Sequence, residues 1–132
     1  MVVVLDCNIW VSLTINSQID FIADLSDNGI IIASCNILRK EIADVLIWPK
    51  LSKFISKSDA NKVILLHDFV TFIYPIGKIP QVVKDKKDNY LFALTTKSKA
   101  DFLVTGDKLL LEVEKYAKVK VISLADFKGM IL

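Results

Sequence analysis

The chain has 132 residues, of which 53% are hydrophobic and 24% are charged. This composition excludes a disordered chain, and the length suits one domain with a buried core. No apolar run approaches the roughly 20 residues that a membrane-spanning helix needs, and the first residues lack the features of a signal peptide. We therefore expect a single cytoplasmic domain over residues 1–132 that does not enter a membrane.

The small net charge of +2 is weak support for a polyanionic partner. The two cysteines, Cys7 and Cys35, are too few for a disulfide scaffold or a zinc site. Each lies beside an apolar strand, which predicts buried free thiols.

Strands and helices are expected to alternate along the chain. In order, they are a strand over 2–5, a helical start over 8–13, a helix over 16–27, a strand over 30–33, helices over 34–47, 51–55 and 58–72, a strand over 72–76, a helix from 88 to 96, a strand over 102–105, a helix over 108–116, a strand over 119–122 and a short last helix. The expected caps are Asn16 or Ser17, Ser34 and Ser123. This order predicts a three-layer α/β/α sandwich with a mainly parallel sheet of about five strands.

The helix over 58–72 is expected to turn its apolar residues inward, and these are Val63, Leu66, Phe69, Val70 and Ile73. The only histidine, His67, lies in the middle of the same helix. Because it is far in sequence from the acids considered below, we interpret it as a packing or surface residue.

Two acids follow strands. Asp6 comes directly after the strand over 2–5, and Asp107 follows the strand over 102–105 across a glycine turn. Open parallel sheets bind ligands at the carboxyl ends of their strands. Both carboxylates therefore belong to that edge, and they converge there if the two strands are neighbours.

Two further acids are placed on helices. In the helix over 34–47, Glu41 falls within the inward apolar stripe, three residues after Leu38 and four before Val45. A carboxylate there is costly unless a cation or a hydrogen-bond donor meets it, although Glu41 could instead lie at the edge of the stripe and pair with a lysine. Asp88 is expected in the first turn of its helix, on the inward side.

Four acids from four elements are thus candidates for one pocket: Asp6, Glu41, Asp88 and Asp107. Close carboxylates raise each other's pKa or require a cation, and an all-oxygen set of donors suits Mg²⁺ or Mn²⁺. Such a site supports metal-assisted hydrolysis at a phosphoryl group. Each acid also has a structural alternative, as a strand end, a helix-dipole partner or an N-cap. No glycine-rich phosphate loop is present.

Three segments of the chain resemble a known family: MVVVLDCNIW at 1–10, DNYLFAL at 88–94 and ADFLVTGDKLLL at 100–111. The whole chain resembles the PIN-domain ribonucleases, and among them the small VapC-like toxins of toxin–antitoxin pairs. The resemblance implies that the four acids match the family's quartet, which holds Mg²⁺ or Mn²⁺. Asn8 and Thr105 match positions that support the site by hydrogen bonds. Asp85 matches an additional acid, supporting or structural, followed by Lys86 where many relatives have proline.

The resemblance further implies an endoribonuclease that cuts single-stranded RNA, forms a homodimer and is silenced by a cognate antitoxin with an apolar or basic segment. Candidate contacts for partners or the dimer are Trp10, Trp48, Phe54 and Tyr74, although aromatic residues more often pack in cores. One alternative is a PIN-like module that binds RNA or a partner and cleaves poorly, against which the intact quartet argues. Another is a receiver-type domain with an acidic Mg²⁺ pocket. This chain argues against it, because no acid follows its third expected strand.

Overall fold

A continuous sheet of six strands forms the centre of the computed structural model, which describes residues 1–132. Its order is β3-β2-β1-β4-β6-β5. The strands are β1 (Val2–Leu5), β2 (Ile31–Ser34), β3 (Thr71–Ile73), β4 (Phe102–Val104), β5 (Lys115–Tyr116) and β6 (Val119–Ile122). All pairs are parallel except β5 with β6. The predicted mainly parallel α/β fold is therefore confirmed, with the two-residue β5 as an additional strand.

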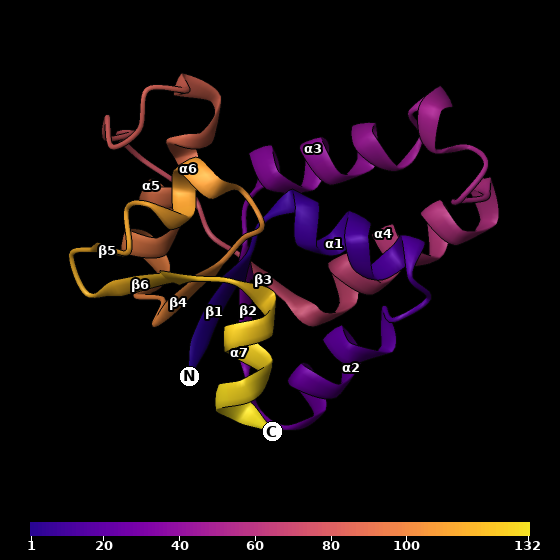
Figure 1. Ribbon diagram of the computed structural model, residues 1–132, viewed down its shortest axis with the longest axis horizontal. Coiled ribbons are helices and arrows are strands. Elements are labelled where there is room, and N and C mark those ends of the chain that lie inside the picture. Colours follow the sequence, from indigo (N-terminus) through magenta and orange to yellow (C-terminus); the bar gives the residue numbers. More distant parts are fainter.

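Helices cover both faces of this sheet. They are α1 (Cys7–Ile15), α2 (Asp20–Asp27), α3 (Asn36–Leu46), α4 (Lys57–Val70), α5 (Tyr90–Ser98), α6 (Lys108–Leu111) and α7 (Leu124–Ile131), with the 3₁₀ turns η1 (Pro49–Leu51) and η2 (Lys86–Asp88). Helices α1 to α4 lie on one side of the sheet and α5 lies on the other (Figure 1). Right-handed crossovers explain this, because the chain moves outward from β1 to β3 and then returns past β1 to β4.

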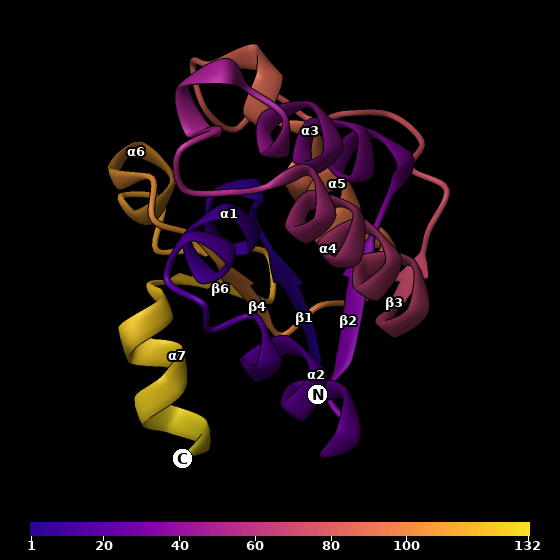
Figure 2. The same cartoon turned by 90° about the vertical axis from the view of Figure 1, so that its right-hand side faces the viewer.

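The central strand β1 shows why its sequence is apolar throughout. Val3, Val4 and Leu5 are fully buried, since β1 lies between β2 and β4 and is covered on both faces. Figure 2 shows α7 and α2 at the end of the molecule where the chain begins, and Phe127 of α7 packs edge-on against Phe21 of α2. No helix combines the length and the apolar composition that crossing a bilayer requires.

Several predicted boundaries are wrong for local reasons. Asn16 and Ser17 do not cap α2; Asn16 ends α1, and Ser17 has a φ of 54° in the connection. No helix forms over 51–55, because η1 ends at Leu51 and only turn residues follow it. The helix expected over 108–116 stops at Leu111, and the residues after Glu114 (φ 61°) pair with β6 instead.

The inward face of α4 also differs from the prediction. Phe69 is 89% exposed, and the buried residues are Ala60, Val63, His67 and Val70. The prediction placed Phe69 inward because it did not count a histidine as a core residue, whereas Leu66 is partly buried against the core as predicted. His67 completes the seven-residue spacing from Ala60 and is fully buried, so of the two roles predicted for it, packing or surface, the structure shows packing.

His67 connects the sheet to two helices. Its Nε2 lies 2.7 Å from the hydroxyl of Ser34, which was expected to cap α3 but belongs to β2. Its Nδ1 lies 3.0 Å from Asp68, whose carboxylate accepts two hydrogen bonds from Arg39 of α3. Burial lowers the pKa of His67, which favours the neutral ring. This chain of contacts joins β2, α4 and α3, the helix that carries Glu41.

Candidate active site

A groove of about 980 Å³ opens at the carboxyl ends of β1 and β4. Its lining includes all four predicted acids, Asp6, Glu41, Asp88 and Asp107, together with Asp85 and Asn8. β1 and β4 are neighbours, with Leu5 aligned with Val104. The structure therefore brings the two strand-end acids to one edge, as the order of the chain predicted.

Asp6 lies at the floor of the groove and is only 5% exposed. Its Oδ1 accepts the backbone N–H of Cys7 (2.7 Å), which makes it the N-cap of α1. Its Oδ2 accepts the hydroxyl of Thr105 (2.8 Å) and the side-chain amide of Asn8 (3.2 Å). The carboxylate is thus held by donors from β1's own end and from the end of β4.

Thr105 and Asn8 tie the two strand ends together behind the acids. The hydroxyl of Thr105, which is fully buried, also accepts the backbone N–H of Asp107 (3.1 Å). The side-chain oxygen of Asn8 accepts the backbone N–H of Gly106 (3.0 Å). Asp107 itself caps α6 by accepting the N–H of Leu109 (2.8 Å). These contacts set the positions of Asp6 and Asp107 relative to each other.

Glu41 reaches the groove from α3 and meets a hydrogen-bond donor from α5. Its Oε1 accepts the hydroxyl of Tyr90 at 3.3 Å, and the carboxylate forms no ion pair with a lysine. Burial raises the pKa of Glu41, and the nearby charge of Asp88 raises it further. The alternative of a lysine pair is therefore not realised.

Asp88 lies in the loop before α5 and not in its first turn, because it ends η2 and α5 begins at Tyr90. The intervening Asn89 is buried and organises this loop. Its side-chain oxygen accepts the N–H groups of Val82 (3.0 Å) and Val83 (2.9 Å), and its amide donates to the carbonyl of Val83 (3.1 Å). Asn89 thereby fixes where Asp88 enters the groove.

Asp85 is exposed and lies at the start of the same turn. It caps η2 by accepting the N–H of Lys87 (3.3 Å), and its carboxylate lies 3.7 Å from the Lys87 ammonium. Lys86, the departure from the family pattern, is the first residue of η2. The turn therefore forms without a proline.

The acids repel one another through the groove. Burial raises the pKa of Asp6 to about 6, and the charges of Glu41 and Asp107 add to that effect, while the Thr105 hydrogen bond opposes it. Burial also raises the pKa of Asp88 to about 6, with contributions from Asp6, Asp85 and Asp107. A site whose carboxylates resist ionisation favours a bound cation.

The donors fit a hard divalent ion by their chemistry. All are carboxylate oxygens, Asp88 accepts no hydrogen bond, and Glu41 and Asp107 each accept one, so oxygens remain free for a metal. In the conformation described, no three acidic, histidine or cysteine side chains stand close enough to hold one metal ion together. Side-chain rotation into the groove would have to bring these oxygens together.

The sequence analysis missed four residues that position the acids or line the groove. Tyr90 and Asn89 position predicted acids, and Lys40 pairs with Asp44 (2.6 Å) on the groove wall. The Tyr90–Glu41 contact spans 49 residues, and no local pattern reports such a pair. Asp44 is four residues after Lys40, a spacing that indicates a helix-surface ion pair.

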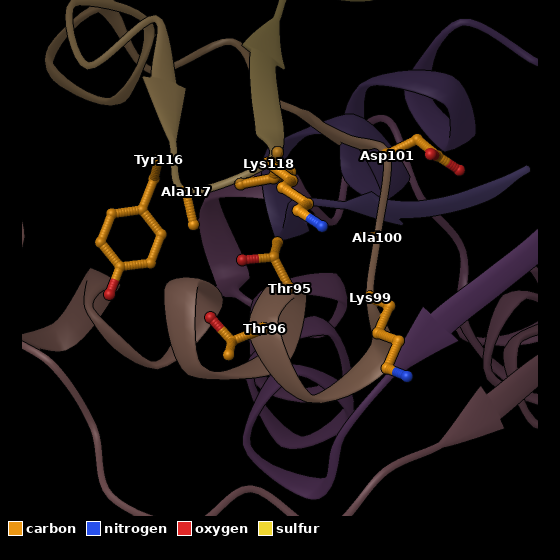
Figure 3. Close-up of a pocket in the computed structure, with 9 residues that line it drawn as sticks. Thr95, Thr96, Lys99, Ala100, Asp101, Tyr116, Ala117 and Lys118 are labelled. Carbon is orange, nitrogen blue, oxygen red and sulfur yellow. The ribbon is translucent and has the colours of Figure 1, made fainter.

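A second cavity of about 490 Å³ lies at the opposite edge of the sheet, beside the start of β4 and β6 (Figure 3). Its lining contains Thr95, Lys99, Lys118 and Tyr116, and its one acid is Asp101. That carboxylate accepts the backbone N–H of Val2 (2.8 Å). The cavity therefore lacks the cluster of acids that defines the groove.

The Thr105→Val variant tests the connection between the strand ends. We expect the free energy of unfolding to fall by about 1 to 2 kcal/mol, because Asp6 loses a donor and the N–H of Asp107 loses its acceptor. Urea unfolding measures this loss. The matched control is Thr96→Val, since the exposed Thr96 hydroxyl only donates to the carbonyl of Phe92. Equal losses in the two variants would contradict the role of Thr105.

Comparison with known proteins identifies relatives of this fold. A family model described as the PIN domain matches residues 2–109. Among solved structures, the crystal structure of VapBC2 from Rickettsia felis bound to a DNA fragment from their promoter is similar, with a TM-score of 0.63 and 15% identity. That likeness covers 93% of this chain and 98% of the other. No curated protein matches significantly.

Proposed function

Because the chain belongs to the PIN domain family, whose members are generally nucleases dependent on a divalent metal, we propose that it is an endoribonuclease that cuts single-stranded RNA. The observation that carries this proposal is the groove, which is lined by four acids from four separate elements. An all-oxygen site of this kind suits hydrolysis of a phosphodiester with Mg²⁺ or Mn²⁺.

We assign the metal-holding role to Asp6, Glu41, Asp88 and Asp107. A divalent ion bound there supplies positive charge to the phosphoryl group and lowers the pKa of a bound water. The orientation of the acids comes from the chain itself: Thr105 and Asn8 hold Asp6, and Tyr90 holds one oxygen of Glu41.

Proton transfer from the attacking water suits Glu41. Its pKa is raised, mainly by burial, which brings the carboxylate closer to the range in which a general base works at neutral pH. Oε1 accepts the Tyr90 hydroxyl, and the Cys7 thiol is a second neighbouring donor that lowers the pKa of the carboxyl slightly. Asp85 and Lys87 lie at the rim, where they shape the turn and take no part in this transfer.

We further propose that the protein is the toxin of a toxin–antitoxin pair. The groove is lined by six carboxylates and two lysines, and seven of its 18 lining residues are hydrophobic. Such a surface complements a partner segment that carries both cationic and apolar residues. The likeness of the fold to VapBC2 from Rickettsia felis, bound to a DNA fragment from their promoter, supports this choice. Trp10 is 1% exposed, so it is a core residue and not a partner contact.

A homodimer is proposed as the working form, since the edge of β3 is not paired with another strand. Light scattering at a known protein concentration gives the mass directly. A mass near twice 14.8 kDa is expected, and a monomer at all concentrations would reject the dimer.

The cleavage experiment compares single-stranded RNA and single-stranded DNA of mixed sequence. We expect RNA to be cut in Mn²⁺ or Mg²⁺, with EDTA removing all activity and excess metal restoring it. Activity that survives EDTA would reject the metal-dependent mechanism. If the protein binds RNA and Mn²⁺ but never cuts, the alternative of a PIN-like binding module replaces the nuclease.

A further inference from the structure

An exposed tryptophan lies at the apolar end of the groove. Trp48 lines the groove and is 52% exposed, whereas the other tryptophan, Trp10, is 1% exposed. Trp48 comes two residues after the end of α3 and seven after Glu41, so the rise of the helix puts it roughly 10 Å from that acid along the helix axis. The indole and the acidic cluster thus line the same groove, a short distance apart.

The backbone around Trp48 is held firmly. Its N–H donates to the carbonyl of Val45 (3.1 Å), and its carbonyl accepts the N–H of Leu51 (2.9 Å). Pro49 occupies the first position of η1 and restricts Trp48 to the extended conformation observed, with φ −58° and ψ 134°. The backbone that carries this large flat side chain is therefore already ordered before a planar ligand binds.

The charges around Trp48 differ from those at the acidic end. Lys50 and Lys53 follow it in the chain, both exposed and neither in an ion pair. On the groove wall between the two ends, Lys40 is already paired with Asp44 and Lys87 lies beside Asp85. Both lysines of the groove lining therefore have an acidic neighbour, whereas Lys50 and Lys53 at the Trp48 end are free to bind a polyanion. Lys86 and Lys108, which are next to acids in the sequence but outside the groove lining, are exposed and unpaired as well.

We propose that Trp48 is a stacking platform for a nucleobase of the RNA strand whose cleaved phosphate lies at the acidic end, and that Lys50 and Lys53 bind flanking phosphates. This inference rests on the proposed function. Stacking on an aromatic ring is a sequence-tolerant source of affinity for single strands. It is needed here because the acidic lining repels phosphates, so ion pairing inside the groove contributes little.

The unpaired lysines distinguish RNA from a protein segment at this position. A partner segment with cationic residues complements the acidic end of the groove but meets like charge at Lys50 and Lys53. A single-stranded nucleic acid has the opposite preference, and each of its bases has a flat face that can stack on the indole. The occupant of the Trp48 end is therefore expected to be a base with its neighbouring phosphates.

Fluorescence tests this platform without any cleavage. A mixed-sequence single-stranded RNA is titrated in EDTA and low salt into wild type, Trp48→Phe and Phe69→Ala. Because Trp10 is buried, a base stacked on Trp48 is expected to quench wild type and Phe69→Ala alike and to leave Trp48→Phe unquenched. Phe69 is the control because it is 89% exposed and lies on α4 outside the groove. No quenching in wild type, or equal quenching in Trp48→Phe, would overturn the proposal.

Cleavage kinetics in the presence of Mn²⁺ or Mg²⁺ test the same platform. For Trp48→Ala we expect KM to rise roughly 5- to 150-fold, as loss of one stacked base predicts, with kcat nearly unchanged. Trp48→Phe keeps a stacking ring and should retain most of the affinity, and Phe69→Ala should match wild type. An unchanged KM in Trp48→Ala would overturn the platform while leaving the nuclease intact. Quenching without any cleavage would support the platform and reject the nuclease.

Discussion

The Asp6→Asn variant is expected to lose RNA cleavage by at least about 1000-fold, which corresponds to about 4 kcal/mol of transition-state stabilisation. Asp6 is the most buried of the four acids and the one whose two oxygens are both positioned by hydrogen bonds. An amide at this position keeps the shape of the side chain but removes the negative charge that a divalent ion requires.

The same variant is expected to be more stable than wild type when metal is absent. The pKa of Asp6 is about 6 in the folded chain, against an ordinary value of 3.8, so the ionised carboxylate is destabilising at pH 7.5. Asparagine also serves as an N-cap, so the contact with Cys7 has a substitute. The amide nitrogen replaces the oxygen that accepts from Thr105 and Asn8, which offsets part of this gain. We therefore expect the free energy of unfolding to rise by about 1 kcal/mol.

Urea unfolding in EDTA and the RNA cleavage assay provide the two readouts for Asp6→Asn. The control is Asp27→Asn, which removes an exposed carboxylate at the end of α2 that makes no side-chain hydrogen bond. It should change neither quantity measurably. If Asp6→Asn loses activity and stability together, the acid is part of the folding framework and the metal-holding role is in doubt.

The stability of the metal-free protein is expected to fall as the pH rises from about 4 to about 7. A carboxyl whose pKa is raised on folding binds more protons in the folded than in the unfolded state within this window, so raising the pH favours unfolding. Asp6 alone accounts for a loss of up to about 3 kcal/mol of the free energy of unfolding, because its pKa rises from 3.8 in the unfolded chain to about 6 in the folded chain. Asp88 and Glu41 act in the same direction.

Two other groups act in the opposite direction. The pKa of His67 is lowered on folding by burial, so its contribution to stability is lost as the pH falls below about 6.5. The Arg39 hydrogen bond holds the pKa of Asp68 at about 2, so that contribution is lost only below about pH 4. Subtracting the pH profile of Asp6→Asn from that of wild type cancels the contributions of His67 and Asp68 and leaves the contribution of Asp6.

Divalent metal should reverse the pH effect. Mn²⁺ is expected to raise the melting temperature more at pH 7.5 than at pH 5, because protons compete for the carboxylates at the lower pH. Differential scanning calorimetry with Mn²⁺ and with EDTA measures this. A metal-induced shift that is equal at the two pH values, or that persists in Asp6→Asn, would place the metal outside the acidic groove.

The central elements were predictable because their signals are local. The apolar run over 2–5 predicts a strand covered on both faces, and β1 is that strand. Ser123 was correctly predicted to cap the last helix, since it accepts the N–H of Asp126. Ser34 was not, because its hydroxyl meets a histidine 33 residues away and the strand continues through it.

The sequence by itself determined the mainly parallel sheet and which acids end strands, because hydrophobic runs and the residues that follow them are read along the chain. Only the tertiary structure decided that β1 and β4 are neighbours, that Tyr90 meets Glu41 and that Asn89 holds the Asp88 loop. It also decided that Trp10 is buried while Trp48 is exposed in the groove. The physical reason is that burial and hydrogen bonding depend on which distant segments pack together, and no local periodicity encodes that choice.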